Sequence, residues 1–116
     1  MRLVLAVHGT ASAAGQRVYR DLADRVGEEV PTALAHLDVQ TPLLPDVVRP
    51  GDVVVPVLLA RGHHVRVDCG AAAHAGALVA PAVGPAPALV SLAQRRLRDA
   101  GAADDWPVVL AAAGSR

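Results

Sequence analysis

Short apolar runs alternate with segments of helical period along nearly the whole chain, and this alternation constrains the fold more than any other feature. The run at 53–59 contains no polar residue, which is typical of a strand buried on both faces of a sheet. Residues 14–30 instead repeat apolar side chains at intervals of three and four positions: Tyr19, Leu22, Ala23, Val26 and Val30. Such alternation predicts an α/β fold with a parallel, doubly wound sheet of four to five strands and helices on both faces.

The individual elements follow from the same pattern and from the positions of proline and glycine. We expect strands at 2–7, 32–39, 53–59, 77–83 and 107–113. We expect helices at 14–30 and from 85–87 to 100, with a short helical turn at 44–48. Residues 61–76 are rich in Gly, Ala and His and have no clean period, so they are predicted to be loop with some helix.

The two ends of the chain carry related sequences. Residues 3–10 (LVLAVHGT) align without a gap with residues 108–115 (VVLAAAGS), and His8 corresponds to Ala113. This predicts one complete α/β unit over 1–104, followed by a strand over 105–116 that resembles the start of a second unit. Only the first copy places an imidazole at the end of its strand.

The composition excludes several classes of function. The 116 residues carry no net charge and only two aromatic side chains, Tyr19 and Trp106, so nothing indicates binding to nucleic acid or to a membrane surface. No apolar stretch reaches the roughly 18–20 residues of a membrane-spanning helix. A single cysteine, Cys69, excludes an internal disulfide framework, and we expect a cytoplasmic protein.

Histidines follow two of the predicted strands. His8 follows the first strand, and His63 and His64 follow the strand at 53–59. Ligands of parallel sheets bind beyond the carboxyl ends of the strands, so these imidazoles could face one crevice. A hydrogen-bonded turn residue without catalytic function is the alternative for His8.

Residues 64–69 alternate polar and apolar side chains. In an extended conformation, His64, Arg66 and Asp68 would share one face, or would form an ordinary solvated ion pair. A closed zinc site could be drawn from His63, His64, Asp68, Cys69 and His74, but this spacing matches no standard zinc motif. Cys69 has no specified base, so we expect a small packed residue rather than a nucleophile.

Two segments resemble the class II chelatases, specifically sirohydrochlorin cobalt/iron chelatases of the CbiX type. The first is residues 3–10, a strand that ends in His-Gly. The second is residues 54–68 (VVPVLLARGHHVRVD), an apolar strand with a proline that leads to a loop with His-Val-Arg and an acidic residue. The resemblance covers nearly the whole chain and implies a flavodoxin-like, chelatase-type sheet.

The resemblance also implies a reaction and a set of residues. It implies insertion of a divalent metal, Co2+ or Fe2+ with Ni2+ as a further candidate, into sirohydrochlorin without a nucleotide. His8 and His64 take the catalytic and metal-binding positions, with His63 as an additional metal ligand. A neutral imidazole holds a divalent ion and accepts protons near neutral pH. Arg61, Arg66 and Arg17 are candidates to bind the substrate carboxylates.

The family occurs as short units that pair into homodimers and as longer chains with two tandem units. We therefore expect the cleft to be completed by a second copy or by a C-terminal half beyond this chain. The alternative function is a non-catalytic metal- or tetrapyrrole-binding module of the same fold. An α/β-hydrolase is not supported, because the sequence has no G-x-S-x-G motif.

Overall fold

The computed structural model of the chain describes residues 1–59 and 62–112, with the backbone alone described for 63–66. The chain divides into two units, Met1–Gly84 and Pro85–Arg116. The first unit contains β1 (Leu3–Val7), α1 (Ala13–Gly27), β2 (Thr32–His36), α2 (Leu44–Val47), β3 (Val53–Pro56), α3 (His63–His74) and β4 (Leu78–Val79). The second unit contains α4 (Pro87–Asp99).

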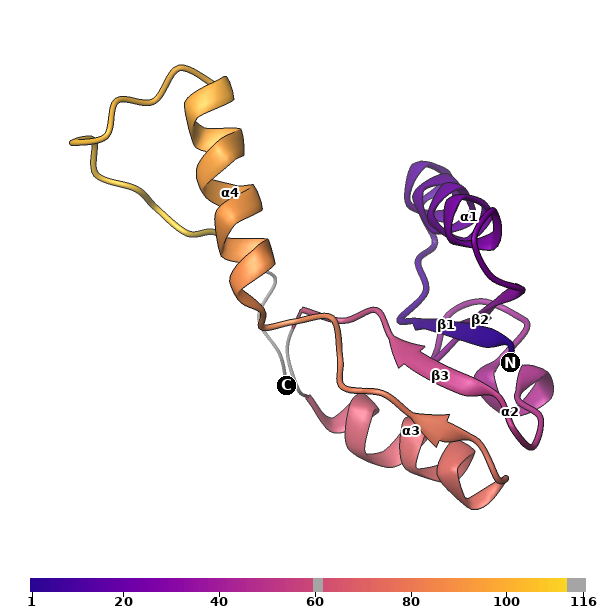
Figure 1. Cartoon of the computed structure of the whole chain (residues 1–116). Helices are drawn as coiled ribbons and strands as arrows, with labels where there is room; N and C mark the ends of the chain where they lie inside the picture. The colour runs from indigo at the N-terminus through magenta and orange to yellow at the C-terminus, as the bar shows by residue number, and fades with distance from the viewer. Residues whose placement is uncertain (60–61, 113–116) are drawn as a thin grey trace. The chain divides into compact units, whose positions relative to one another are not determined.

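The strands form a four-stranded, entirely parallel sheet in the order β2-β1-β3-β4. β1 lies in the middle, with Ala6 opposite Ala35 of β2 on one side and Pro56 of β3 on the other. Helix α1 covers one face, and α2 and α3 cover the other (Figure 1). The predicted doubly wound α/β sheet with helices on both faces is confirmed.

The core lies between the sheet and the helices α2 and α3. Val4 and Val54 point from the sheet into the same cluster as Leu44 of α2 and Cys69 and Ala72 of α3, and all five are nearly inaccessible to solvent. On the opposite face, α1 presents a half-buried stripe of apolar residues at helical spacing, as predicted, which includes Tyr19, Leu22, Ala23 and Val26. Ser12 begins α1 by accepting a hydrogen bond from the Gly15 amide at 3.4 Å.

Three element predictions are corrected. Residues 63–74 form the regular helix α3 rather than mainly loop, because alanine favours the helix and its buried side is made of small residues. The prediction of an extended segment with His64, Arg66 and Asp68 on one face is therefore wrong. In a helix, positions 64 and 68 lie one turn apart on the same side, and position 66 lies on a different side. The strands predicted at 32–39, 53–59 and 77–83 are shorter, at Thr32–His36, Val53–Pro56 and Leu78–Val79.

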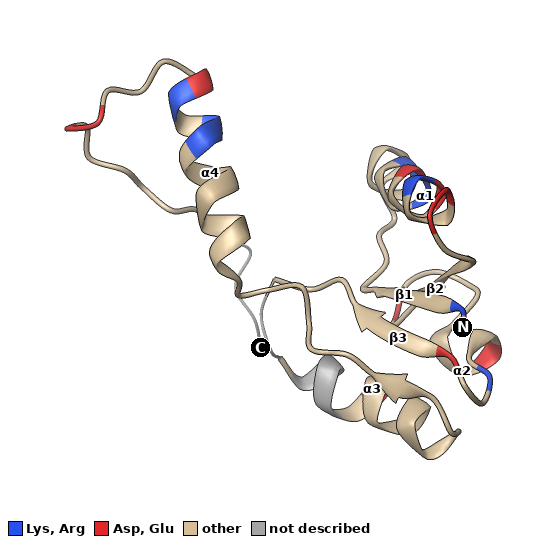
Figure 2. Ribbon diagram, viewed as in Figure 1, with Lys and Arg blue, Asp and Glu red and all other residues tan. Residues whose placement is uncertain are grey.

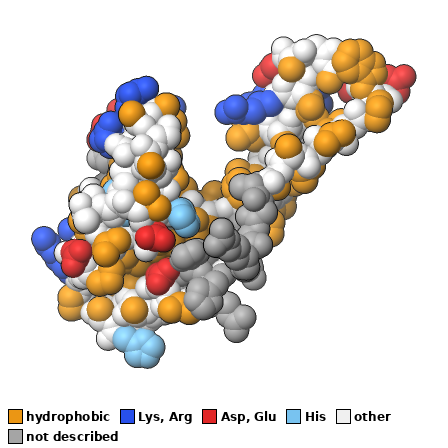
Figure 3. Space-filling model, turned by 180° about the vertical axis from the view of Figure 1, so that it is seen from behind, with side chains coloured by type: hydrophobic (Ala, Val, Ile, Leu, Met, Phe, Trp, Pro, Cys, Tyr) orange, Lys and Arg blue, Asp and Glu red, His pale blue; other side chains and the backbone are white. Residues whose placement is uncertain are grey.

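The strand predicted at 107–113 is the third correction. Residues 107–112 adopt no strand and pair with none of the described strands, because an apolar run becomes a strand only where a neighbouring strand completes its hydrogen bonds. Position 113 lies outside the described residues. In this second unit α4 ends at Asp99, and Gly101 at positive φ lies just past its end, as predicted. The amides of Gly101 and Ala102 donate to the carbonyls of Arg98 and Leu97. Figure 3 shows hydrophobic side chains on the surface of this unit. Val109 and Leu110 are about nine-tenths exposed.

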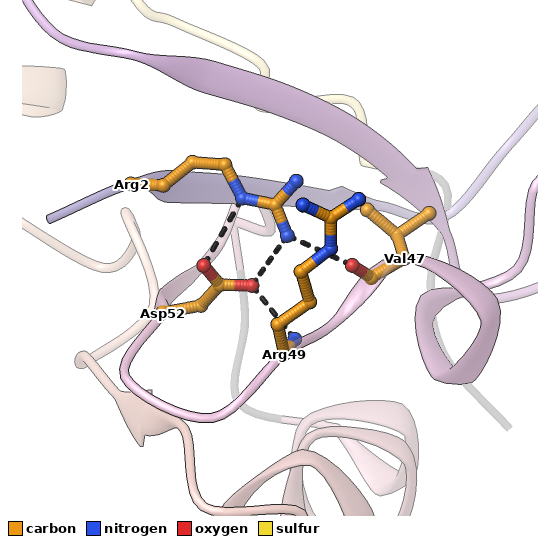
Figure 4. Close-up of polar contacts among 4 residues, drawn as sticks. All are labelled: Arg2, Val47, Arg49 and Asp52. Carbon is orange, nitrogen blue, oxygen red and sulfur yellow. Dashed lines mark hydrogen bonds and ion pairs between the residues drawn. The ribbon is translucent and has the colours of Figure 1, made fainter.

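An ion pair ties the amino ends of β1 and β3 together (Figure 4). Arg2 donates from Nε to Oδ1 of Asp52 at 3.0 Å and from Nη2 to Oδ2 at 2.6 Å, and also from Nη2 to the carbonyl of Val47 at 2.9 Å. The Arg49 amide donates to the same carboxylate at 2.8 Å. The hydrogen bonds from Arg2 outweigh the burial of Asp52 and hold the pKa of its carboxyl below the ordinary value. We call these residues the amino-edge clamp.

Candidate functional site

The candidate site lies at the carboxyl edge of the sheet. We use this name for the described residues that follow the strands, 8–12 after β1, 37–43 after β2 and 57–59 after β3, together with the first turn of α3. The pairing of β1 with β3 continues into this edge, because the Val57 amide donates to the carbonyl of Ala6 at 2.8 Å. Since the strands are parallel, residues that are distant in sequence meet here.

His8 is the first residue beyond β1 and is half-buried. Its carbonyl accepts a hydrogen bond from the Asp38 amide at 2.9 Å, so the backbone of His8 is held by the segment after β2. Its ring nitrogen Nδ1 lies 3.2 Å from the carbonyl oxygen of Gly9. A carbonyl can only accept, so Nδ1 carries the proton in this contact, and in the neutral form of the ring Nε2 then carries the lone pair.

Gly9 permits a close approach between two loops. It has a φ of 101°, and a Cβ atom at this position would collide with the carbonyl oxygen of Asp38. The Asp38 carbonyl in turn accepts a hydrogen bond from the Gln40 amide at 2.7 Å. Val39, the middle residue of this three-residue turn, has a φ of 65°. This three-residue turn is rare and strained, and it is especially unfavourable for a β-branched residue. Glycine on one side and a strained valine on the other therefore bring the two loops together.

Side chains reinforce this junction. Gln40 accepts from the Thr10 amide through Oε1 at 2.9 Å, and Gln16 of α1 donates from Nε2 to the Thr10 carbonyl at 3.0 Å. Neither Gln40 nor Gln16 was predicted from the sequence to be a functional residue. The available signal for Gln40 was the polar pair Gln40-Thr41 directly after the strand predicted at 32–39.

His64, the second predicted site histidine, follows a strand that is the neighbour of β1, so its backbone lies at the same edge of the sheet. His63 and His64 form the first turn of α3, which follows β3, the neighbour of β1. The side chains of His63, His64 and Arg66, and the whole of Arg61, lie outside the described residues. The structure therefore places the backbone of His64 at the carboxyl edge and gives no distance between its imidazole and that of His8.

Two further residues singled out from the sequence lie on the helices that begin at this edge. Arg17 is exposed on α1, the helix that begins after the His8 loop. Asp68 is half-buried on α3, one turn after His64. A cavity of about 80 Å³ lies between α2 and α3 and is lined by Asp68 and mainly apolar residues. This cavity is far smaller than the roughly 300–1,000 Å³ of pockets that enclose small organic ligands.

The remaining histidines and the cysteine lie in other surroundings. His36 ends β2, is buried, and donates from Nδ1 to the carbonyl of Pro42 at 3.1 Å. His74 is exposed at the far end of α3 and donates from Nδ1 to the carbonyl of Gly70 at 2.8 Å. Cys69 packs in the core, where burial raises the pKa of its thiol. It is therefore a packing residue, as expected.

The described residues contain no group of three or more His, Cys, Asp or Glu side chains arranged to hold a metal ion. Among the described helices, none combines the length and the apolar character needed to cross a membrane. Charged residues of both signs are interspersed along α1, and both signs also occur near the end of α4 (Figure 2).

Comparisons with known proteins identify the family. A search of curated proteins finds no match for this sequence. The fold is similar to the crystal structure of a CbiX protein assigned to cobalamin (vitamin B12) biosynthesis in Marinobacter aquaeolei VT8, with a TM-score of 0.68 and 24% sequence identity. The similarity covers 85% of this chain and 95% of that chain. The family model named CbiX matches residues 2–100. The chain therefore belongs to the CbiX family, whose members are chelatases that insert a divalent metal ion into a tetrapyrrole.

Proposed function

We propose that this chain inserts Co2+ or Fe2+ into sirohydrochlorin, on the route to cobalamin or sirohaem. The observation that carries the proposal is the position of His8, held at the carboxyl edge with its Nδ1 donating to the Gly9 carbonyl. The family supplies the reaction class. The local geometry supports His8 as the residue that receives the metal ion.

His8 has the chemistry that the reaction requires. With the proton on Nδ1, the neutral ring offers the Nε2 lone pair to an incoming divalent ion, and imidazole nitrogen suits both Co2+ and Fe2+. A carbonyl that accepts from the other ring nitrogen is the usual way in which proteins orient a metal-binding histidine. Insertion releases the two protons of the pyrrole N–H groups, so each turnover also needs a proton acceptor.

We assign the second role to His64. The topology supports this assignment, because β1 and β3 are adjacent and parallel and α3 begins with His63 and His64. A neutral imidazole is the form that accepts a proton or binds a metal ion. His63, one position earlier, is the additional candidate ligand.

Arginine side chains are proposed to hold the carboxylates of the substrate. Arg17 is exposed on α1, and Arg61 and Arg66 flank His64 in sequence. Guanidinium groups form paired hydrogen bonds with carboxylates, so several arginines around one edge would fix the orientation of a macrocycle with many carboxylates. The metal ion is a substrate in this scheme, and the chain needs no nucleotide.

We further propose that a second copy, or a second half of the same protein, completes the substrate cleft. The described cavity of about 80 Å³ lies between α2 and α3 and cannot enclose a tetrapyrrole. Sedimentation of the protein with and without sirohydrochlorin distinguishes the two cases. A dimer in the bound state supports completion by a second copy, and a monomer in both states excludes a second copy.

The proposed function is tested by anaerobic incubation with sirohydrochlorin and Co2+, Fe2+ or Ni2+, followed by absorbance of the metallated product. We expect metallation above the uncatalysed rate and a loss of roughly 100-fold or more in His8→Ala and His64→Ala. His74→Ala is the matched control, because His74 is exposed at the opposite end of α3 and should keep the rate. Co2+ binding without turnover would instead favour the non-catalytic binding module.

A further inference from the structure

The peptide group between Gly9 and Thr10 makes two hydrogen bonds in opposite directions. Its carbonyl oxygen accepts from Nδ1 of His8 at 3.2 Å, and its N–H donates to Oε1 of Gln40 at 2.9 Å. A peptide group is planar, so fixing the direction of its N–H also fixes the direction of its C=O. Gln40 is therefore connected to the His8 imidazole through a single rigid group.

The structure assigns Gln40 as a positioning residue for His8, acting through the Gly9–Thr10 peptide plane. The assignment rests on the proposed function of His8 and deepens it. When Oε1 of Gln40 holds the Thr10 amide, the Gly9 carbonyl is directed at the ring and selects the form with the proton on Nδ1. Nε2 is then the nitrogen that offers a lone pair to the metal ion. Aligned hydrogen bonds also polarise one another, which makes the ring a better electron donor.

The surroundings of Gln40 show how its side chain is placed. Gln40 follows Val39 in the strained turn at a φ of 65°, and the Asp38 carboxylate supports this turn by accepting from the Val39 amide at 2.7 Å. Non-glycine residues in such conformations persist only where the surrounding structure holds them. Here the strained turn brings Gln40, 30 positions away in sequence, onto Thr10.

The opposite side of Thr10 is also held. Gln16 of α1 donates to the Thr10 carbonyl at 3.0 Å, and the Thr10 hydroxyl accepts from the Ser12 amide at 3.1 Å. The peptide groups on both sides of Thr10 are therefore fixed by side chains. Of these two glutamines, Gln40 is the one that bonds to the peptide group that reaches His8, so Gln40 and Gln16 should differ in their effect on the ring.

The test compares Gln40→Leu, which removes the acceptor, with Gln40→Glu, which keeps an oxygen at the same reach. Gln94→Leu on α4 is the matched control, because it makes the same chemical change at an exposed site. We expect Gln40→Leu to lower kcat for metallation by about 10- to 100-fold, with KM for sirohydrochlorin little changed. Gln40→Glu should restore most of the rate, and Gln94→Leu should behave as wild type. A general loss of folding would not be rescued by Glu.

A second readout does not depend on activity. Nitrogen-15 NMR of the His8 ring reports which nitrogen carries the proton, and we expect mainly Nδ1–H in wild type and Gln40→Glu and a shift toward Nε2–H in Gln40→Leu. An unchanged ring in Gln40→Leu, or a Gln40→Glu variant as slow as Gln40→Leu, would overturn the positioning role. If His8→Ala keeps full activity while the His8 ring of Gln40→Leu shifts toward Nε2–H, the positioning role of Gln40 stands and the proposed function of His8 fails.

Discussion

At the amino edge of the sheet, the Asp52 carboxylate receives hydrogen bonds from Nε and Nη2 of Arg2 and from the Arg49 amide. At the carboxyl edge, the corresponding positions carry a histidine, a glycine at positive φ and a valine in a strained turn. The amino edge thus pairs opposite charges with one another and favours stability. The carboxyl edge uses unfavourable backbone conformations to orient an imidazole, which is typical of functional sites.

The amino and carboxyl ends of the same strands therefore differ in what their residues stabilise. Variants at the amino edge should lower stability and leave the chemistry of the folded protein intact. Variants at the carboxyl edge should change the chemistry more than the stability, except where two backbones touch.

Gly9→Ala addresses that exception and should have the largest effect on stability. The added Cβ would meet the Asp38 carbonyl and lie 3.4 Å from Cβ of Val39. We expect a loss of about 2–4 kcal/mol in the free energy of unfolding, measured by urea denaturation. Gly51→Ala is the matched control, because Gly51 also has a positive φ, 85°, but nothing lies within 4 Å of its Cβ position. Equal losses in the two variants would mean that the contact with Asp38 contributes nothing.

Asp52→Asn tests the amino-edge clamp. The substitution removes the charge of a carboxylate that is 5% exposed, while Arg2 keeps its charge. We expect a loss of about 1–3 kcal/mol in the free energy of unfolding, because hydrogen bonds to charged groups contribute about that much. Asp104→Asn, at an exposed position of the second unit, should change stability by less than about 0.5 kcal/mol. If Asp52→Asn were as stable as wild type, the amino-edge clamp would not be a stabilising element.

The same carboxylate predicts a pH dependence of stability. The pKa of Asp52 is lowered in the folded protein, so its contribution is fully present above the unfolded value of about 3.9 and is lost as the pH falls through the folded value. The stability difference between wild type and Asp52→Asn should therefore be constant from neutral pH to about pH 4 and shrink below it. Denaturation curves of both proteins across this range check the prediction. A difference that grows toward low pH would contradict it.

Val39→Asn should have the smallest effect on stability among these variants, and it should stabilise the protein rather than destabilise it. Asparagine tolerates a positive φ better than valine, and Val39 is 56% exposed, so little packing is lost. We expect a gain of up to about 1 kcal/mol in the free energy of unfolding. Val67→Asn makes the same change at a similarly exposed position in α3 and should bring no gain. A destabilised Val39→Asn variant would show that the turn is not strained.

The sequence predicted the parts of the fold that depend on local pattern. β1 and α1 follow from an apolar run and from helical spacing, and the position of His8 beyond β1 follows from the rule for parallel sheets. Helix α3 was largely missed, because Cys69 and Ala72, which form part of its buried side, are too small to give a clear hydrophobic period. The apolar run at 107–112 was predicted as a strand, because a run of that composition does not reveal whether a partner strand is present.

The junction at Thr10 could not be predicted in the same way. Gln40 and Thr10 are 30 positions apart, and their contact depends on the register of β1 with β2 and on the turn at Val39. No local pattern in either segment specifies the other. The available signal was a polar residue directly after a predicted strand. Such a residue is expected at the edge of the sheet, but its hydrogen-bond partner cannot be predicted from it.

The comparison of the two edges is tested most directly with one pair of variants, His8→Ala and Asp52→Asn, measured for both Co2+ insertion into sirohydrochlorin and unfolding by urea. We expect His8→Ala to lose roughly 100-fold or more of the rate while its free energy of unfolding changes by less than about 1 kcal/mol. Asp52→Asn should lose stability and keep the rate of the folded protein. A His8→Ala variant that metallates at the wild-type rate would contradict the central claim that the carboxyl edge performs the reaction through His8.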